Sequence, residues 1–273
     1  MHKQIISSAF LQHNLKPMLT KTIKDFARAA FPGSYQRSEE AITRYRLRTV
    51  TRALQRKYGQ VIQGGPFQGM KYVSEAVCSS LAPKLLGSYE AELHEALNQI
   101  IKTEYQTVID VGCAEGYYAI GLALRLPRTS VFAFDIDERA RTLCTLLAME
   151  NNVADRISVQ GECDHEKLHE LIQGRTLIVC DCEGCELGLL DPVLVPNLRR
   201  SDLLVELHDM VDARISETIV SRFTGTHEVT LIDSVERNPT DFPALKDFNE
   251  ASQRTAVAEF RDTTMQWAYM LAR

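Results

Sequence analysis

The chain has 273 residues, of which 45 % are hydrophobic and 25 % charged, and its formal net charge is −5. This composition is ordinary for a globular protein, no apolar run is long enough to span a bilayer, and the N-terminal MHKQIISSAF lacks the apolar core of a secretory signal. These features exclude a membrane-spanning protein, and we expect a cytoplasmic one. The seven cysteines are odd in number, and we expect Cys113, Cys144 and Cys180 to be free and buried because they lie in or beside apolar segments.

The first part of the chain is basic and is predicted to be helical. Residues 1–60 carry twelve Lys and Arg against three Asp and Glu, a net +9 that leaves −14 for the rest. Helices are predicted over 16–31, ending at the PGS triplet, and over 38–59, ending at a glycine. A basic arm can indicate nucleic acid, but this one has no dense basic run and no nucleic-acid motif. We therefore expect residues 1–62 to be a helical arm that docks on its own acidic body or on a second subunit, as a homodimer, with no membrane or nucleic-acid partner.

The remainder, residues 63–273, is predicted to form one α/β domain. A glycine-rich connector with a short strand, GGPFQGMKY, is followed by a predicted helix over 88–101 and then by alternating strands and helices. Near-continuous apolar strands separated by helices indicate a Rossmann-like, doubly wound, mostly parallel seven-stranded sheet with helices on both faces. Ligands bind such sheets beyond the carboxyl ends of the strands. The expected strands are 107–111, 130–135, 156–160, 176–181, 202–207, 228–235 and 266–272, with helices at 117–126 and 138–152.

The end of the first predicted strand, VIDVGCAEGYYAIGLAL, has the pattern of a nucleotide site. Gly112 and Gly116 allow a tight turn and close approach to a ligand, and the helix that starts near Tyr117 directs free N–H groups to the same point. The dinucleotide fingerprint G-x-G-x-x-G does not fit, because Ala114 and Tyr117 stand where it requires glycine.

The D-x-G-x-x-x-G spacing that begins at Asp110 resembles motif I of class I S-adenosylmethionine (SAM)-dependent methyltransferases. The resemblance implies that SAM, or its product S-adenosylhomocysteine, binds at this turn. The cofactor contacts that it implies here are Asp110, Gly112, Cys113, Ala114, Gly116 and Tyr117.

The next two strand ends add candidate cofactor residues. Asp135, nineteen positions after Gly116, can accept hydrogen bonds from both ribose hydroxyls, as the strand-two acid does in this family, and Ile136 follows it. The alternative role for Asp135 is capping the next helix, for which Asp137 is better placed. At the third strand end the resemblance places an acidic or polar residue near the adenine amine. Here the candidates are Glu162, with Cys163 beside it, and Asp164, which could instead cap a helix.

The fourth strand exits through LIVCDCEGCELGLLDP, which contains three cysteines. A C-x-C-x-x-C triplet of Cys180, Cys182 and Cys185 could bind a metal or cluster, but closed zinc sites take four ligands. The fourth ligand would have to come from Cys113 or His208. We interpret the cysteines as packing residues, with a metal–thiolate protein as an alternative.

The same stretch, CDCEGCELGLLDP, together with DLLVELHD resembles the FkbM-type methyltransferase family, over residues 87–236. The resemblance implies O-methylation of a hydroxyl on a small molecule, sugar or natural product. It also places Tyr89 and Glu90 near the methionine end of the cofactor, although an acidic first helical turn explains Glu90 equally well. The cysteines in GCAEG and DCEGCE depart from the family pattern and leave the acceptor open.

Methyl transfer to oxygen requires a base near the cofactor, and Asp181 and His208, with Glu206 beside them, are the candidate catalytic residues. Asp181, Glu183, Glu206 and Asp209 could also bind Mg²⁺, which would lower the pKa of the acceptor hydroxyl. Without a metal, neighbouring acids would raise one another's pKa. The plainer alternatives are that His208 is a hydrogen-bonded strand-end residue and that Glu183 caps the turn at Gly184.

The segment before the last strand, residues 240–262, is a candidate helical lid, with Arg237 and Arg261 available to bind an acceptor; a surface helix at the sheet edge is the alternative. Two further functions compete with O-methylation. One is methylation of nitrogen, carbon or a protein side chain with the same cofactor. The other is SAM binding without catalysis, in a regulatory or assembly protein.

Overall fold

The computed structural model describes residues 32–77, 79–261 and 263–273, with side chains from residue 36. The chain divides into two compact units, residues 1–49 and 50–273, and the sheet and all sites below belong to the second. The predicted arm at residues 1–62 ends at a different residue from the first unit, and it stays a prediction.

Helix α2 spans Pro32–Tyr58 and ends at Gly59, whose φ of +70° suits a glycine. The helix predicted over 38–59 starts earlier than predicted, because the PGS triplet forms the beginning of α2, where the missing N–H of Pro32 interrupts no helical bond. The helix predicted over 16–31 lies outside the described residues.

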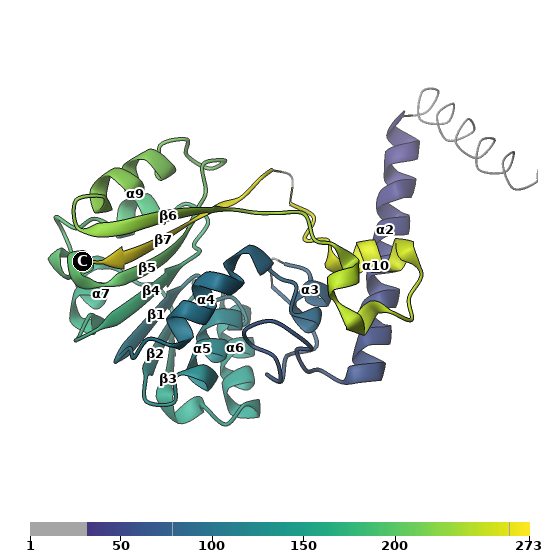
Figure 1. The fold of residues 1–273 in the computed structure, drawn as a ribbon, viewed down its shortest axis with the longest axis horizontal. Helices are drawn as coiled ribbons and strands as arrows, with labels where there is room; N and C mark the ends of the chain where they lie inside the picture. Colours follow the sequence, from purple (N-terminus) through teal and green to yellow (C-terminus); the bar gives the residue numbers. More distant parts are fainter. Residues whose placement is uncertain (1–31, 78, 262) are drawn as a thin grey trace, which may run out of the picture. The chain divides into compact units, whose positions relative to one another are not determined.

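The second unit contains the seven-stranded sheet that the sequence predicts, in the order β3-β2-β1-β4-β5-β7-β6 (Figure 1). Strands β1 to β5 pair in parallel, and β7 pairs antiparallel with β5 and β6. Central strands β1, β4 and β5 are buried along their whole length, which is why they read as continuous apolar runs. The strands are Thr107–Val111, Ser130–Phe134, Ile157–Gln160, Thr176–Cys180, Asp202–Leu207, His227–Asp233 and Gln266–Ala272.

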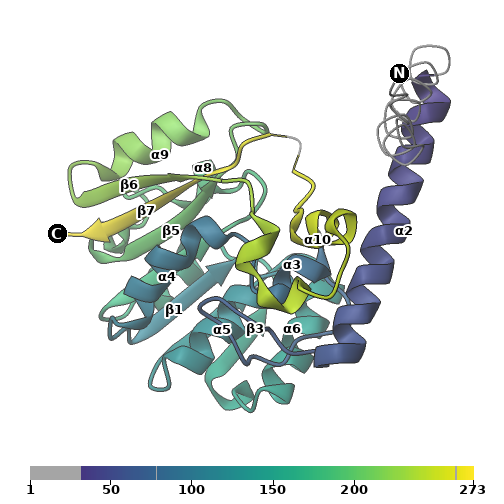
Figure 2. The same cartoon turned by 45° about the vertical axis from the view of Figure 1, so that its right-hand side comes forward.

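Helices cover both faces of the sheet, and Figure 2 shows α4 and α9 on opposite sides of β6 and β7. One core packs α4, α5 and α6 against the sheet, and the other packs α7, α8 and α9. None of the helices in the described residues combines the length and apolar content that a bilayer crossing requires. The α-helices are α3 Leu81–Leu86, α4 His94–Ile101, α5 Tyr117–Arg125, α6 Glu138–Glu150, α7 His165–Leu171, α8 Glu186–Leu189, α9 Ile215–Phe223 and α10 Glu250–Val257. Short 3-10 helices span Ala91–Leu93, Ala154–Arg156, Pro196–Arg200, Pro239–Asp241 and Pro243–Leu245.

Two predicted elements differ from the structure. The helix expected over 88–101 consists of a 3-10 turn and then α4, because Glu90 adopts a left-handed conformation with a φ of +47° that a continuous helix excludes. The short strand expected in the glycine-rich connector is reduced to an isolated bridge between Val61 and Lys71.

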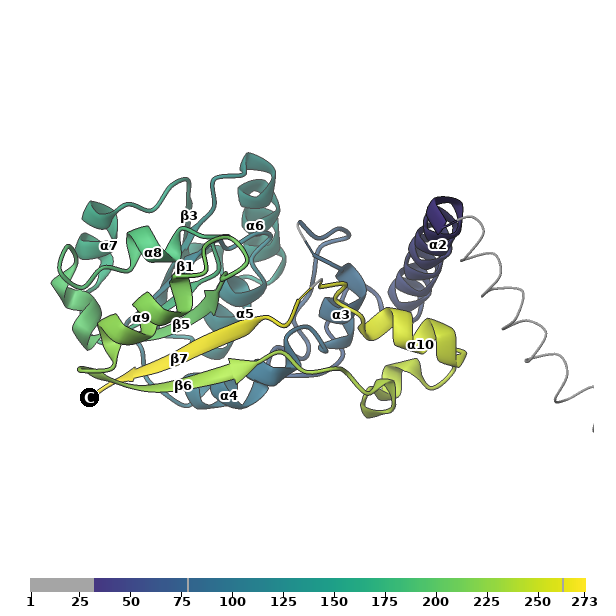
Figure 3. The same ribbon diagram turned by 90° about the horizontal axis from the view of Figure 1, so that it is seen from above.

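The segment between β6 and β7 leaves the sheet and returns to it (Figure 3). It contains two 3-10 turns and α10, which packs on α3. This segment includes the predicted lid at 240–262, and its end, Phe260 and Arg261, reaches the cleft described below.

Candidate active site

A cleft of about 1240 Å³ opens at the carboxyl ends of the parallel strands. It lies at the topological switch point of the sheet, where β1 and β4 are neighbours although 64 residues separate the end of β1 from the start of β4. Ten of the fifteen predicted catalytic and cofactor-binding residues line it: Tyr89, Gly112, Ala114, Asp135, Ile136, Glu162, Cys163, Asp181, Glu206 and His208. Five others do not: Glu90, Asp110, Cys113, Gly116 and Tyr117 are buried behind its wall.

The turn after β1 fits against the exit of β4 so closely that only glycine can occupy position 112. Gly112 has a φ of +84°, and a Cβ there would lie 1.6 Å from the carbonyl oxygen of Asp181. The Asp181 N–H in turn donates to the Val111 carbonyl at 2.9 Å. The motif I turn therefore sets the position at which Asp181 enters the cleft.

The residues behind the wall support this turn. Burial raises the pKa of Asp110 to about 7, and one of its carboxylate oxygens has no hydrogen-bond partner. A Cβ at Gly116 would lie 2.8 Å from the Cys144 sulfur. The Tyr117 ring packs edge-on against Phe67 and other aromatic rings. These side chains shape the cleft from below.

A buried ion pair that the sequence analysis missed anchors the same turn. The Glu115 carboxylate accepts hydrogen bonds from Lys84 Nζ and Tyr72 Oη, both at 2.6 Å, and from the Val77 N–H at 3.0 Å. Burial alone would raise the pKa of Glu115, but the Lys84 ammonium together with the hydrogen bonds from Tyr72 and Val77 outweighs burial and lowers it. Lys84 also lies over the Tyr89 ring. Because the partners lie 31 to 43 residues apart, local sequence patterns contained no signal for this cluster.

At the end of β2, Asp135 bridges two segments of the cleft wall. Its Oδ2 accepts from the Ala114 N–H and its Oδ1 from the Asp137 N–H, each at 2.8 Å. The helix cap of α6 is Asp137, which accepts from the Arg139 N–H, so Asp135 is not needed as a cap. Ile136 is 84 % exposed at the cleft wall and presents an apolar surface.

At the end of β3, Asp164 caps α7 by accepting from the Lys167 N–H at 2.8 Å. This is the capping role that the sequence left open for Asp164. Glu162 is exposed and Cys163 half-buried, and all three line the cleft. Glu162 is therefore the carboxylate available to a ligand here.

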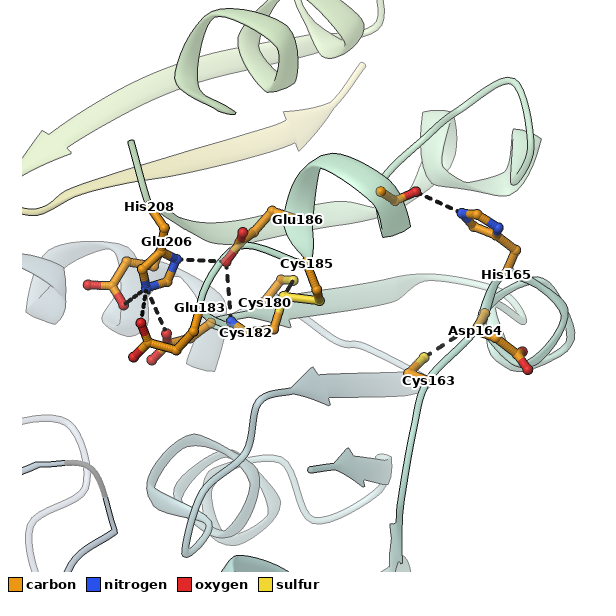
Figure 4. Close-up of a disulfide and its surroundings, with 12 residues drawn as sticks. Cys163, Asp164, His165, Cys180, Cys182, Glu183, Cys185, Glu186, Glu206 and His208 are labelled. Carbon is orange, nitrogen blue, oxygen red and sulfur yellow. Dashed lines mark hydrogen bonds and ion pairs between the residues drawn. A yellow bond between two sulfur atoms is a disulfide. The ribbon is translucent and has the colours of Figure 1, made fainter. Parts of the chain in front are cut away.

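The centre of the cleft contains the buried imidazole of His208, surrounded by carboxylates (Figure 4). Its Nδ1 lies 2.7 Å from Oε1 of Glu186. On the other side, Nε2 lies 3.4 Å from Glu206, 3.5 Å from Asp181 and 3.6 Å from Glu183. Strands β4 and β5 thus bring together all three predicted catalytic residues, and α8 contributes Glu186, which the sequence analysis did not single out.

These contacts determine the charges in the cluster. Burial lowers the pKa of His208, but hydrogen bonds to Glu186 and Glu206 outweigh burial and raise the pKa to about 10. Burial would raise the pKa of Glu206, yet the hydrogen bond from His208 and the charge of Arg261 contribute to lowering it to about 2. The pKa of Asp181 is raised, first by burial and then by the Glu206 charge. His208 is therefore an imidazolium at neutral pH, and the Asp181 carboxylate is more basic than that of Glu206.

Arg261 connects the cluster to the turn before α4. Its Nη1 lies 2.6 Å from Glu206 Oε1, its Nε lies 3.1 Å from Glu259, and its Nη2 contacts Glu90. Glu90 also accepts from Tyr118 Oη, and burial followed by the Glu206 charge raises its pKa to about 7. Arg261, considered in the sequence for acceptor binding, is thus paired with protein carboxylates.

Arg237, the other arginine considered for the acceptor, lies apart from the cleft. It is buried and pairs with Glu92 and Glu259. Asp209, a predicted metal ligand, does not line the cleft either, because its carboxylate accepts from the Ser216 N–H at the start of α9.

The interpretation of all the cysteines as packing residues is wrong for two of them. Cys182 and Cys185 form a disulfide in the cleft wall (Figure 4). Cys113, Cys144 and Cys180 are free and buried, as predicted. The spacing of the triplet contained no signal that separates a disulfide from a metal site.

Comparisons with known proteins agree with the fold. The family "Ribosomal protein L11 methyltransferase (PrmA)" matches residues 93–181, about a third of the chain, from the 3-10 turn before α4 to the exit of β4. This match supports a SAM-dependent methyltransferase with no acceptor specified. Among curated proteins, none matches the sequence significantly.

Several solved structures match the chain at low sequence identity. They include a human methyltransferase 10 domain containing protein (15 % identity, 84 % of this chain and 97 % of that one, TM-score 0.45) and a precorrin-6y C5,15-methyltransferase from Geobacter metallireducens GS-15 (10 %, 74 % and 93 %, 0.45). A third is an rRNA methylase from Streptococcus thermophilus (11 %, 66 % and 96 %, 0.43). Because these TM-scores are below 0.5, the fold assignment depends on the sheet order, which is that of the class I methyltransferase fold.

Proposed function

We propose that this protein is a SAM-dependent O-methyltransferase that acts on a hydroxyl of a small molecule, sugar or natural product, as in the FkbM-type family. One observation carries the proposal: Asp135 and the Gly112 turn line the same cleft as the Asp181–Glu206–His208 cluster. A cofactor site and a candidate base therefore lie side by side. A cytoplasmic location and a homodimer through the arm stay predictions.

The charge of the cleft suits SAM. Among the described residues, eight carboxylates line it, against two cationic side chains besides its histidines, and of these two Lys84 is paired with Glu115 and Arg261 with three carboxylates. Such an excess of negative charge favours a ligand with a sulfonium and an ammonium group. The carboxylates are Asp135, Asp137, Glu162, Asp164, Asp181, Glu183, Glu206 and Glu259.

Individual residues also fit the parts of the cofactor. Asp135 retains acceptor capacity for ribose hydroxyls, because each of its oxygens accepts only one backbone N–H. Ile136 offers an apolar surface for adenine, and Glu162 an acceptor for its amine. The cleft volume exceeds the usual range of about 300–1000 Å³ for a single ligand, which leaves room for an acceptor beside the cofactor.

SAM, when bound, supplies a methyl group already activated by its positive sulfur, so the protein's part is to position the acceptor and to take its proton. Asp181 is the better candidate for the base, because its raised pKa makes its carboxylate more basic than an ordinary aspartate. Its side chain is 23 % exposed and lines the cleft, so an acceptor can reach it. His208, with a pKa of about 10, is already protonated and cannot accept the proton at neutral pH.

The remaining groups keep Asp181 in position and stabilise its charge. The His208 imidazolium lies beside Asp181 and favours its ionised form before the transfer, so that a carboxylate is available to accept the proton. Arg261 compensates Glu206 and Glu90, which would otherwise leave two uncompensated charges in a buried site.

A metal-assisted version is the second candidate, and the spacing of the cluster favours it. Four ligands about 2.1 Å from a tetrahedral ion lie about 3.4 Å apart. The distances from His208 Nε2 to Asp181 and Glu206 are 3.5 and 3.4 Å, and the ligand atoms of these three residues all lie within 4.8 Å of one another, in a group that does not include Glu183. A divalent ion would then be held by Asp181, Glu206 and His208, and not by Glu183 or Asp209, and would lower the pKa of an acceptor hydroxyl.

The direct test is formation of S-adenosylhomocysteine from SAM in the presence of hydroxyl, amine and thiol acceptors, with and without a chelator. We expect turnover with hydroxylated acceptors. Turnover confined to amines, carbon acids or a protein would assign the alternative methyltransferase class. Binding of SAM without turnover on any acceptor would favour the non-catalytic alternative. Loss of activity in chelator, restored by Mg²⁺, Mn²⁺ or Zn²⁺, would establish the metal-assisted version.

A further inference from the structure

The disulfide in the cleft wall has unequal access to solvent at its two ends. Cys185 is exposed, whereas Cys182 is half-buried, and both line the cleft (Figure 4). Thiol–disulfide exchange begins with in-line attack of a thiolate on one sulfur, so access decides which sulfur reacts. An external thiol can reach Cys185 first.

The two residues inside this disulfide have an unusual backbone. Glu183 and Gly184 have φ values of +55° and +111°. The left-handed region is disfavoured for a residue with a side chain such as Glu183, and it persists only where the surrounding structure holds it. The covalent bond from Cys182 to Cys185 closes this turn and so helps to hold it.

The turn is connected to the His208 cluster by three contacts. The Cys182 N–H donates to Glu186 Oε1 at 3.2 Å, and the same oxygen lies 2.7 Å from His208 Nδ1. Glu183 inside the turn lies 3.6 Å from His208 Nε2. Asp181 directly precedes Cys182. A change in the turn therefore alters the contacts of both imidazole nitrogen atoms, Nδ1 through Glu186 and Nε2 through Glu183.

A third cysteine lies next to the pair. The Cys180 sulfur is 3.6 Å from the Cys182 sulfur and fully buried. Because the Cys180 side chain is fully buried and Cys185 is exposed, a reductant from the solvent reaches the disulfide at Cys185 and not through Cys180.

We propose that Cys182 and Cys185 form a thiol–disulfide exchange site, with a dithiol as its reductant, and that its oxidation state sets the position of Glu183 and Glu186 around His208. One thiolate of the dithiol attacks Cys185 Sγ, forms a mixed disulfide and releases Cys182 as a thiolate, which takes up a proton. The second thiol of the dithiol loses its proton and attacks the mixed disulfide, which releases Cys185. The released Cys185 thiolate also takes up a proton, so the protein gains two protons and two electrons, and the dithiol becomes a cyclic disulfide.

This inference does not depend on methyl transfer, because it concerns the turn and the imidazole and is measured without cofactor. It also gives the disulfide a role in a reducing compartment, where protein disulfides are usually transient and redox-active. A disulfide with a purely structural role would instead resist reduction in the folded protein.

The first experiment counts thiols in the folded chain. The protein is treated with dithiothreitol at neutral pH without denaturant, alkylated, and analysed by mass spectrometry, while circular dichroism confirms that it stays folded. We expect reduction to add two alkylated cysteines, both in the peptide with Cys182 and Cys185. Cys163→Ser, which removes a free cysteine of the same cleft, should also gain two, and the Cys182→Ser/Cys185→Ser variant none. Alkylation of both cysteines before reduction, or reduction only after unfolding, would overturn the proposal.

The second experiment measures the connection to His208. In protein with ¹⁵N-labelled histidine, the His208 ring signals should differ between the oxidised and reduced forms, and those of Cys182→Ser/Cys185→Ser should match the reduced form. The signals of His227, which bonds the Ser201 carbonyl elsewhere, should not move. Identical His208 signals in both forms would refute the link to the cluster. Stoichiometric Zn²⁺ binding that protects Cys180, Cys182 and Cys185 from alkylation would replace the exchange site with a metal–thiolate site.

Discussion

The imidazole Nδ1 of His208 lies 2.7 Å from Oε1 of Glu186, and both side chains are buried. This contact fixes the ring so that Nε2 points to the carboxylates of β4 and β5. Glu186 is thereby a positioning residue: it touches no part of the cleft opening but orients a group that does.

The pKa of His208 should fall in Glu186→Gln. The variant keeps the shape of the side chain but removes the charge that helps to raise this pKa from 6.5 to about 10. Because the folded pKa is raised, protonation of His208 contributes stability that is complete below about pH 6.5 and is lost as the pH rises through about 10. The difference in the free energy of unfolding between wild type and variant should therefore decrease as the pH rises from about 6.5 to about 10. NMR titration and chemical unfolding measure both effects, and an unchanged pKa would contradict the assigned role.

Asp181→Asn should lower kcat by a factor of about 10²–10⁴, the usual contribution of a general base, and leave the affinity for SAM within a few-fold. The amide keeps the shape of the side chain but cannot take a proton. Asp191→Asn is the matched control, because Asp191 pairs with Arg222 outside the cleft. If Asp181→Asn turns over at the wild-type rate, another group is the base.

Asp135→Asn should weaken SAM binding about 10- to 100-fold, because hydrogen bonds to a charged acceptor contribute about 1.5–3 kcal/mol. Asp137→Asn, two residues on, alters a helix cap and should leave the affinity nearly unchanged. Calorimetric titration of the two variants distinguishes these outcomes. Equal affinities would remove Asp135 from the cofactor site.

Gly112→Ala should destabilise the fold by about 2–5 kcal/mol, because it combines left-handed strain with overpacking. Its Cβ would overlap the Asp181 carbonyl. Gly161→Ala, whose Cβ would meet no atom within 4 Å, should change stability by less than about 0.5 kcal/mol. The stabilities of the two variants are compared by their midpoints of unfolding in urea. Similar midpoints would show that the ends of β1 and β4 are not in close contact.

Arg261→Met should cost about 3–5 kcal/mol, the usual effect of removing one partner of a buried ion pair. The variant leaves Glu90 and Glu206 without their cation, which raises their pKa values, so its stability should recover as the pH falls and they become protonated. Arg254→Met removes only an exposed pair with Glu250 and should cost about 0.5 kcal/mol or less. A similar decrease in the free energy of unfolding of both variants would contradict the role given to Arg261.

The fold was predictable because it is encoded locally. Strands β5 and β7 begin and end where their apolar runs do, and Asp137 and Gly59 act as the cap and stop that their types predict. Glu90 was not foreseen, because its left-handed backbone is held by tertiary contacts with Glu259 and Arg261 about 170 residues away.

The candidate site was predictable only where it follows the strand ends. Asp135, Asp181 and His208 reach the cleft because parallel strands present their carboxyl ends at one edge. Asp209, next to His208, instead accepts a hydrogen bond from the Ser216 N–H. The residue type alone does not predict this orientation of its side chain. Arg261 enters from a distant segment, and its contacts depend on packing that no local pattern contains.

The most direct test is isothermal titration of the wild-type protein with S-adenosylhomocysteine, followed by a crystal structure of the complex. We expect one molecule to bind per chain, with its ribose on Asp135 and its sulfur beside Asp181. No heat of binding, or a ligand bound outside the cleft at the ends of β1, β2 and β4, would contradict the proposed cofactor site.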